Sequence, residues 1–162
     1  MTTAITASLQ ANSNMIKFKQ DLNYTLQNPS EQRNRRSAMF ESEYAKCEYI
    51  AKDNVVLHVW KKEAHFDAYR NPVIASLEML REHKGSIFVV DARNGFEDVK
   101  EDVEWGFSYF LPQLKKAGCS TWGFILPKLS NIEGEIDLWS REIEKNFRVI
   151  RAESYEEVLA KC

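Results

Sequence analysis

Short apolar runs alternate with longer amphipathic segments through the C-terminal two thirds of the chain. Ile87 to Val90 and Thr121 to Leu126 are apolar runs, and each is followed by a stretch with apolar residues three or four positions apart. Apolar runs of about four to eight residues are typical of buried strands, and spacings of three and four are typical of helices. Strands that alternate with helices indicate an α/β domain built on a mainly parallel sheet.

Two further runs rich in β-formers, residues 44–51 and 54–61, precede this alternation. The pair Asp53-Asn54 between them tolerates the left-handed backbone of tight turns, so the two runs are predicted to form an antiparallel hairpin. In the second run both faces are largely apolar: one carries Val55, Leu57 and Val59, the other Val56, His58 and Trp60. A strand that is apolar on both faces is expected to be covered on both.

A helix is predicted over residues 65–83, where apolar residues recur at helical spacing. Asp67 is available as its N-terminal cap. Pro72 is expected near the first turn, where a missing N–H costs least.

The next helix is expected to begin at a capping box formed by Asp98 and Glu101 and to end at Gly118. Pro112 lies inside it and is expected to kink it. A third helix is marked by apolar residues between 132 and 143.

A short strand over residues 147–150 and a helix capped by Ser154 complete the chain. The predicted order is therefore ββαβαβαβα, a mixed and mainly parallel sheet with an N-terminal antiparallel hairpin. Residues 39–162 are assigned to this domain, and residues 1–38 to a partly flexible N-terminal arm with a short helix near residues 15–26.

The charge balance restricts the classes of partner. With 24 acidic and 22 basic side chains the net charge is −2, too small a field to gather nucleic acid. No apolar run approaches the roughly 20 residues that span a bilayer, and no signal peptide is evident, so a cytoplasmic protein without membrane insertion is expected. Cys47 and Cys119 are interpreted as small core residues.

No pattern of catalytic residues stands out. The glycines are scattered and form no phosphate loop, the three histidines lack metal-ligand spacing, and no serine lies in a nucleophile elbow. His58 is interpreted as a satisfied interior histidine. The protein is therefore expected not to be an enzyme and to need neither a metal nor another cofactor.

The loop after the central strand is the first candidate binding site, because open α/β sheets bind ligands beyond the carboxyl ends of their strands. Asp91, Arg93 and Asn94 would bind an anionic or polar partner there. In the alternative, Asp91 and Asn94 order the turn and Arg93 pairs with a nearby carboxylate. Capping and solvation at a helix start are taken to explain the carboxylates that follow: Glu97, Asp98, Glu101, Asp102 and Glu104.

Aromatic residues make up 12% of the chain and supply the other candidates. Trp105 and Tyr109 are four positions apart and lie off the apolar stripe of their helix, so they are expected to form an exposed contact surface for a protein partner and a homodimer. Alternatively, the domain holds a small apolar ligand between sheet and helices, with Trp60, Phe66 and Tyr69 lining the site.

Several segments within roughly residues 40–162 carry a resemblance to a known family. They include Val55 to Trp60, Tyr69-Arg70, Leu80 to Lys84, Val89 to Asn94, Glu104-Trp105, Phe110 to Pro112 and Ile125 to Pro127. In these segments the chain resembles the SpoIIAA-like branch of the STAS (sulfate transporter and anti-sigma-factor antagonist) superfamily. The resemblance implies a sheet layered with helices that acts as a protein-binding or ligand-sensing module.

In the anti-sigma-factor antagonists a serine near the helix after the central strand is phosphorylated. Residues 91–104 contain neither Ser nor Thr, so this switch is not carried over. The resulting expectation is a non-catalytic STAS-like binding or regulatory module, with a small apolar-ligand carrier or sensor as the alternative.

Overall fold

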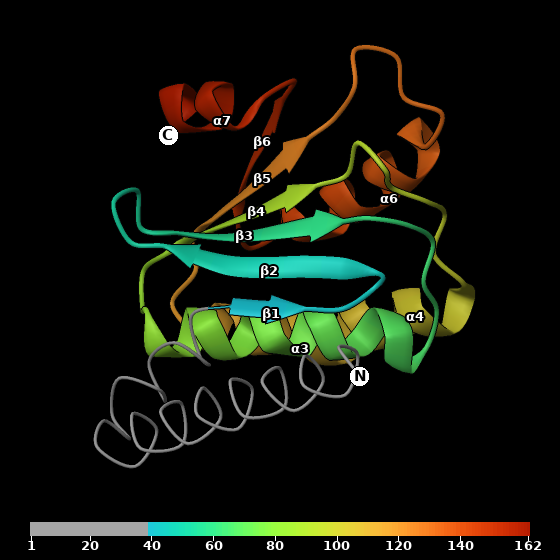
Figure 1. The fold of residues 1–162 in the computed structure, drawn as a ribbon, viewed down its shortest axis with the longest axis horizontal. Helices are drawn as coiled ribbons and strands as arrows, with labels where there is room; N and C mark the ends of the chain where they lie inside the picture. Colours follow the sequence, from blue (N-terminus) through green and yellow to red (C-terminus); the bar gives the residue numbers. More distant parts are fainter. Residues whose placement is uncertain (1–38) are drawn as a thin grey trace, which may run out of the picture. The chain divides into compact units, whose positions relative to one another are not determined.

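The computed structural model describes residues 39–162, and the predictions for the N-terminal arm lie outside that range. The elements follow one another as shown in Figure 1: β1 (Met39–Glu41), β2 (Ala45–Ile50), β3 (Val55–Trp60), α3 (Asp67–Glu82), β4 (Ile87–Asp91), α4 (Lys100–Trp105), the π-helical turn η1 (Gly106–Phe110), α5 (Leu111–Lys116), β5 (Thr121–Ile125), α6 (Glu133–Ile143), β6 (Arg148–Ala152) and α7 (Tyr155–Lys161).

Within residues 39–162 the six strands form one mixed sheet in their order along the chain. Strands β1, β2 and β3 pair antiparallel, and β3 to β6 pair parallel. The predicted α/β class and hairpin are confirmed, and the elements from β2 onward follow the predicted order. The short edge strand β1 was not predicted, because three residues are too few to show an alternating pattern.

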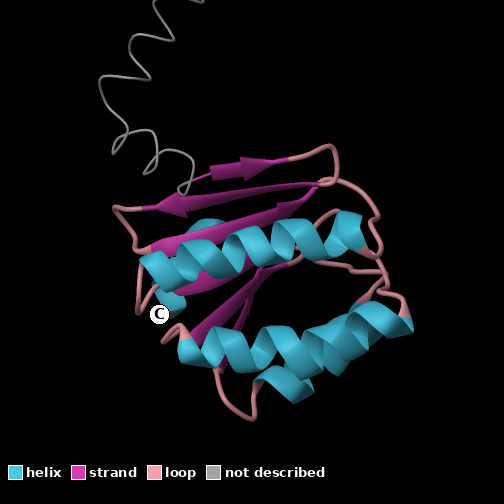
Figure 2. Ribbon diagram, turned by 90° about the horizontal axis from the view of Figure 1, so that it is seen from below, coloured by secondary structure: helices cyan, strands magenta, loops and turns pink. Residues whose placement is uncertain are grey.

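The helices that connect the parallel strands cover one face of the sheet (Figure 2). Connections between parallel strands are right-handed almost without exception, so strands that advance in one direction place their connecting helices on the same side. Val73 of α3, Leu114 of α5 and Ile143 of α6 accordingly belong to one core cluster. Val158 of α7 belongs to a second cluster on the opposite face, with Val89.

Strand β3 is embedded between these two clusters. Val56 and Trp60 belong to the helix-side cluster, whereas Val55 and Leu57 pack in the cluster under α7. The prediction that both faces of this strand are covered is therefore confirmed. At the preceding turn Asn54 has a φ of 53°, the left-handed conformation expected there.

The start of α3 differs from the prediction, because Asp67 is its first residue and caps nothing. The residue before the helix is Phe66, with a φ of 53° and no side-chain cap. Its N–H donates to Asp102 Oδ2 at 2.8 Å, and Arg70 Nε donates to Asp102 Oδ1 at 2.8 Å. A fully buried carboxylate 36 residues away thus performs the role assigned to Asp67. Pro72 lies inside the helix, in its second turn rather than its first.

The next helical segment is continuous from α4 through η1 to α5, but it has no capping box. Val99 stands at its N-terminal boundary without a side-chain cap, and Asp98 forms its hydrogen bonds elsewhere, with Tyr69 and Trp139. Helical geometry departs from α in the π-helical turn immediately before Pro112.

Gly118, with a φ of 83°, follows the end of α5 as predicted. The Ser154 cap is also confirmed, since its hydroxyl accepts from Glu157 N at 3.2 Å. Cys47 and Cys119 are buried as predicted. Among residues 39–162, no helix combines the length and apolar character needed to cross a membrane.

Candidate functional site: an aromatic cavity with a carboxyl pair

A cavity of about 60 Å³ lies between the sheet and the helices that cover it. All four tryptophans of the chain line it: Trp60 from β3, Trp105 from α4, Trp122 from β5 and Trp139 from α6. A space of this size holds several water molecules or one small ligand.

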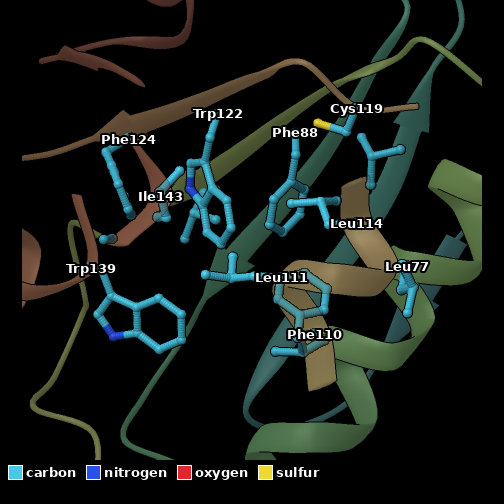
Figure 3. Packing of buried hydrophobic residues seen from close by; sticks show 14 of the residues in the cluster. Leu77, Phe88, Phe110, Leu111, Leu114, Cys119, Trp122, Phe124, Trp139 and Ile143 are labelled. Atoms are coloured by element: carbon cyan, nitrogen blue, oxygen red, sulfur yellow. The ribbon is translucent and has the colours of Figure 1, made fainter. Parts of the chain in front are cut away.

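Its wall consists of side chains that point inward from neighbouring strands and from the helices that cover them. The Trp60 ring stacks on Tyr69 of α3 with centroids 5.2 Å apart, and Phe88 of β4 lies 4.7 Å from Trp122. Figure 3 shows Phe88 and Trp122 from the sheet beside Phe110 from the helical layer. Because successive strand residues alternate between faces, these rings share the helix side of the sheet.

The π-helical turn shapes one side of the cavity. Gly106, Trp105 and Phe110 all line it, and a Cβ added at Gly106 would lie 2.3 Å from Cη2 of Trp139. Only a glycine therefore allows this turn to approach the Trp139 indole. Such turns inside α-helices occur frequently at functional sites.

Two carboxyl groups meet at the cavity, Asp98 from the loop before α4 and Glu135 from α6. Asp98 Oδ2 accepts from the Tyr69 hydroxyl at 3.1 Å and from Trp139 Nε1 at 3.0 Å. Trp139 Nε1 also donates to Glu135 Oε1 at 2.8 Å, so the two carboxyl groups accept from the same indole N–H.

This environment raises the pKa of Asp98 from 3.8 to about 8, first through burial and second through the negative charge of Glu135. Asp98 is therefore mostly protonated at neutral pH. Burial and the adjacent Asp98 also raise the pKa of Tyr69 well above its usual range, so its phenol remains a hydrogen-bond donor.

Two buried polar atoms of cavity-lining residues have no hydrogen-bond partner within residues 39–162, His58 Nε2 and Trp122 Nε1. The other ring nitrogen of His58 lies 3.0 Å from Ser76 Oγ and 3.3 Å from Cys47 Sγ. Burial lowers the pKa of His58 to about 3, so the ring is neutral. The prediction of a satisfied histidine holds for one nitrogen only, and the second requires water or a ligand as its partner.

Three of the aromatic residues singled out from the sequence line the cavity: Trp60, Tyr69 and Trp105. Phe66 does not, because its ring is 53% exposed beside the start of α3. Tyr109 is also exposed, with its ring 5.5 Å from that of Trp105.

The loop residues Asp91, Arg93 and Asn94 lie outside the cavity lining, although their neighbours Ala92 and Gly95 belong to it. Arg93 Nη2 and Nε donate to Asp91 at 2.6 and 2.9 Å. This is the arrangement of the alternative interpretation, in which Arg93 pairs with a nearby carboxylate. The strand order never reverses among β3 to β6, so the sheet has no switch-point crevice at this loop.

Sequence reasoning missed the polar part of the site. Asp98 and Asp102 were both interpreted as capping or solvated carboxylates, yet Asp98 faces the cavity and Asp102 is fully buried. Local spacing holds no signal for either role, because their partners come from α3 and α6. The sequence did hold one signal for the site, its four tryptophans, which lie at inward positions of four different elements.

No group of three or more His, Cys, Asp or Glu side chains in residues 39–162 is arranged to hold a metal ion. Comparison of the chain with protein-family models, curated proteins and solved structures returned no match. The resemblance to the STAS superfamily therefore stays a prediction.

Proposed function

We propose that residues 39–162 form a small-ligand binding module, a carrier or sensor rather than a catalyst. The observation that carries this proposal is the convergence of all four tryptophans on one cavity that also contains two carboxyl groups. Ligand sites are typically apolar and aromatic cavities with a few polar groups that fix orientation, and this cavity has that composition.

The ligand of this proposal has a polar group as well as an apolar body. A purely apolar ligand would leave His58 Nε2 and Trp122 Nε1 without partners, at a cost of about 1–3 kcal/mol for each buried group. It would also lie against the charged pair of Asp98 and Glu135 without compensating it. The sequence-based alternative of a small apolar ligand is thus refined to a small amphipathic one.

Tryptophan fluorescence tests this proposal directly, because every tryptophan lies at the cavity. Isobutanol is a suitable neutral probe, with an apolar branch and one hydroxyl. Titration in the millimolar range is expected to change the emission with saturation. Native mass spectrometry of protein purified from its own host is expected to show a retained small molecule.

Paired variants separate binding in the cavity from binding elsewhere. Val90→Phe adds a ring at a cavity-lining position of β4, whereas Val149→Phe makes the same change on the same sheet face outside the lining. The first is expected to abolish saturation and the second to preserve it, with both folded by circular dichroism. Equal binding by both variants would contradict the proposal.

A second candidate function, a STAS-like regulatory module that binds proteins, is favoured by an aromatic strip on the outer surface. Phe66, Arg70, Trp105 and Tyr109 form this strip, with the Arg70 guanidinium 5.9 Å from the Phe66 ring and 5.5 Å from the Trp105 ring. Phe66 and Tyr109 are 53% and 40% exposed. Exposed aromatic residues beside an arginine are common at the centres of protein interfaces, and a second copy of the chain is the proposed occupant.

A further inference from the structure

We propose that the ligand is a small organic cation, whose ammonium group lies against the Asp98–Glu135 pair and whose apolar part packs among the aromatic rings. This inference rests on the proposed function and specifies its ligand class. Three observations support it: the arginine partners of the buried carboxylates, the aromatic rings of the cavity and the groups that surround Asp98.

The two buried carboxylates of the described domain, Asp91 and Asp102, are neutralised by arginine. Asp102 pairs with Arg70 at 2.8 Å, and Asp91 pairs with Arg93 at 2.6 Å. Within residues 39–162, neither Asp98 nor Glu135 forms an ion pair with a basic side chain. Both side chains are half-buried at the cavity, and negative charge partly withdrawn from water without a counter-charge is unfavourable, so a bound cation stabilises it.

The cavity wall suits a cation in a second way. The faces of tryptophan and tyrosine rings attract cations within about 6 Å of the ring centroid. Arg70 demonstrates this on the outer side of Trp105, where its guanidinium lies 5.5 Å from the ring centroid. Tyr69 and Trp139 each donate a hydrogen bond to Asp98, and Trp60 stacks on Tyr69 in the cavity wall.

His58 adds a polar group to the cavity wall that suits a cationic ligand. Among residues 39–162 His58 Nε2 has no partner, while Ser76 and Cys47 contact the opposite nitrogen. In the tautomer that donates from Nδ1 to Ser76, Nε2 accepts a hydrogen bond from an ammonium N–H. The neutral imidazole therefore offers the cation an acceptor without repelling it.

Binding of a cation is coupled to release of the Asp98 proton. The groups that face Asp98 are Tyr69 from α3 and Glu135 from α6, with the Asp102–Arg70 ion pair near Tyr69. When the cation binds, the O–H bond of protonated Asp98 breaks, its proton passes to the solvent buffer, and the Asp98 carboxylate becomes anionic against the ligand. The ligand itself gains and loses nothing.

Calorimetry with an isosteric pair of probes tests the inference: isobutylammonium and isobutanol have the same branching and the same number of non-hydrogen atoms. We expect isobutylammonium to bind at least tenfold more tightly than isobutanol at pH 8. Its affinity should fall as the pH is lowered from 8 to 6, while that of isobutanol stays constant. At pH 7, where Asp98 with its pKa of about 8 is mostly protonated, titrations in phosphate and in Tris should show a buffer-dependent heat that corresponds to release of most of one proton.

Two variants assign the effect to the carboxyl pair. Glu135→Gln and Asp98→Asn are expected to remove the tenfold preference and the proton release while isobutanol binding persists. Glu133→Gln on the same helix removes an exposed charge that lies 3.9 Å from Arg151, and it should change neither. Asp98 accepts from both Tyr69 and Trp139, whereas Glu135 accepts from Trp139, so Glu135→Gln should remain folded if Asp98→Asn does not.

The outcomes distinguish the assignment of a cationic ligand from the ligand-binding function itself. Equal affinity for the two probes, or a preference that survives in Glu135→Gln, overturns the cation assignment and leaves the ligand-binding function standing. Failure of both probes to bind overturns the function together with the assignment. Tenfold preference with proton release, lost in Glu135→Gln and kept in Glu133→Gln, supports both.

Discussion

Replacing Asp102 with alanine perturbs the link on which the start of α3 depends. The Asp102 carboxylate is fully buried, and it accepts from the Phe66 backbone N–H and from Arg70 Nε, each at 2.8 Å. These bonds join α4 to α3 beside Tyr69 and Trp105, two residues of the cavity wall. The substitution removes the helix cap and the charge partner of Arg70 together.

The expected loss of stability follows from these two contacts. Loss of a capping acceptor costs about 1 kcal/mol, and breaking a fully buried ion pair costs about 3–5 kcal/mol. The Arg70 side chain is 28% exposed, so part of its lost pairing is replaced by hydration. We therefore expect Asp102→Ala to lower the free energy of unfolding by about 3 kcal/mol, below the sum of the two values.

Urea denaturation followed by circular dichroism measures this loss. At a slope of about 1–3 kcal/mol per molar, the midpoint should fall by about 1–3 M. Glu104→Ala on the same helix removes an exposed carboxylate 3.6 Å from Lys100 and should cost less than about 0.5 kcal/mol. In a double-mutant cycle, Arg70→Met should cost less in the Asp102→Ala background than alone. A loss no larger than that of Glu104→Ala would refute this role for Asp102.

Four other predictions concern the cavity, the cysteines and the exposed strip. The pKa of Asp98 is raised from 3.8 to about 8, so its contribution to stability falls as the pH rises through that window. In urea titrations at pH 5 and pH 8, Asp98→Asn should therefore gain stability relative to wild type at the higher pH. Gly106→Ala should lose about 1–3 kcal/mol in the same assay through its clash with Trp139, whereas Gly134→Ala, with open space around it, should not lose stability. Cys162 should react with a thiol reagent in the native protein. Burial raises the pKa of Cys47 to about 12, so Cys47 should react only on unfolding, and equal reaction rates would place it at the surface. Sedimentation equilibrium should show a homodimer that the Phe66→Ser/Tyr109→Asn double variant weakens, and a monomeric wild type would remove the second candidate function.

The elements from β2 onward and their order could be predicted because each leaves a local pattern. The apolar run in β4 and the glycine after α5 report strand and helix boundaries within a few residues of sequence. Helix starts were harder, since local capping signals compete with tertiary contacts. Asp67 and Asp98 both looked like caps, but Phe66 is bound by a distant carboxylate and Asp98 by Tyr69 and Trp139.

The candidate site was only partly predictable for the same reason. Trp60 and Tyr69 could be selected as cavity-lining residues, because aromatic side chains at inward positions must meet between the layers. The pairing of Asp98 with Glu135 joins a loop and a helix separated by β5, and no spacing rule connects them. The raised pKa of Asp98 arises from its burial beside Glu135, a property of the fold rather than of either local segment.

The indole N–H resonances give the most direct test that this cavity is a ligand site. In a ¹⁵N-labelled protein the four tryptophans report from four elements around one space. On titration with isobutylammonium, we expect the four indole signals to shift along one saturation curve. Trp122 and Trp139 should move most because, within the described part of the chain, Trp122 Nε1 has no partner and Trp139 Nε1 donates to the carboxyl pair. Saturating shifts confined to backbone amides of the outer surface, with the indole signals unchanged, would contradict the account.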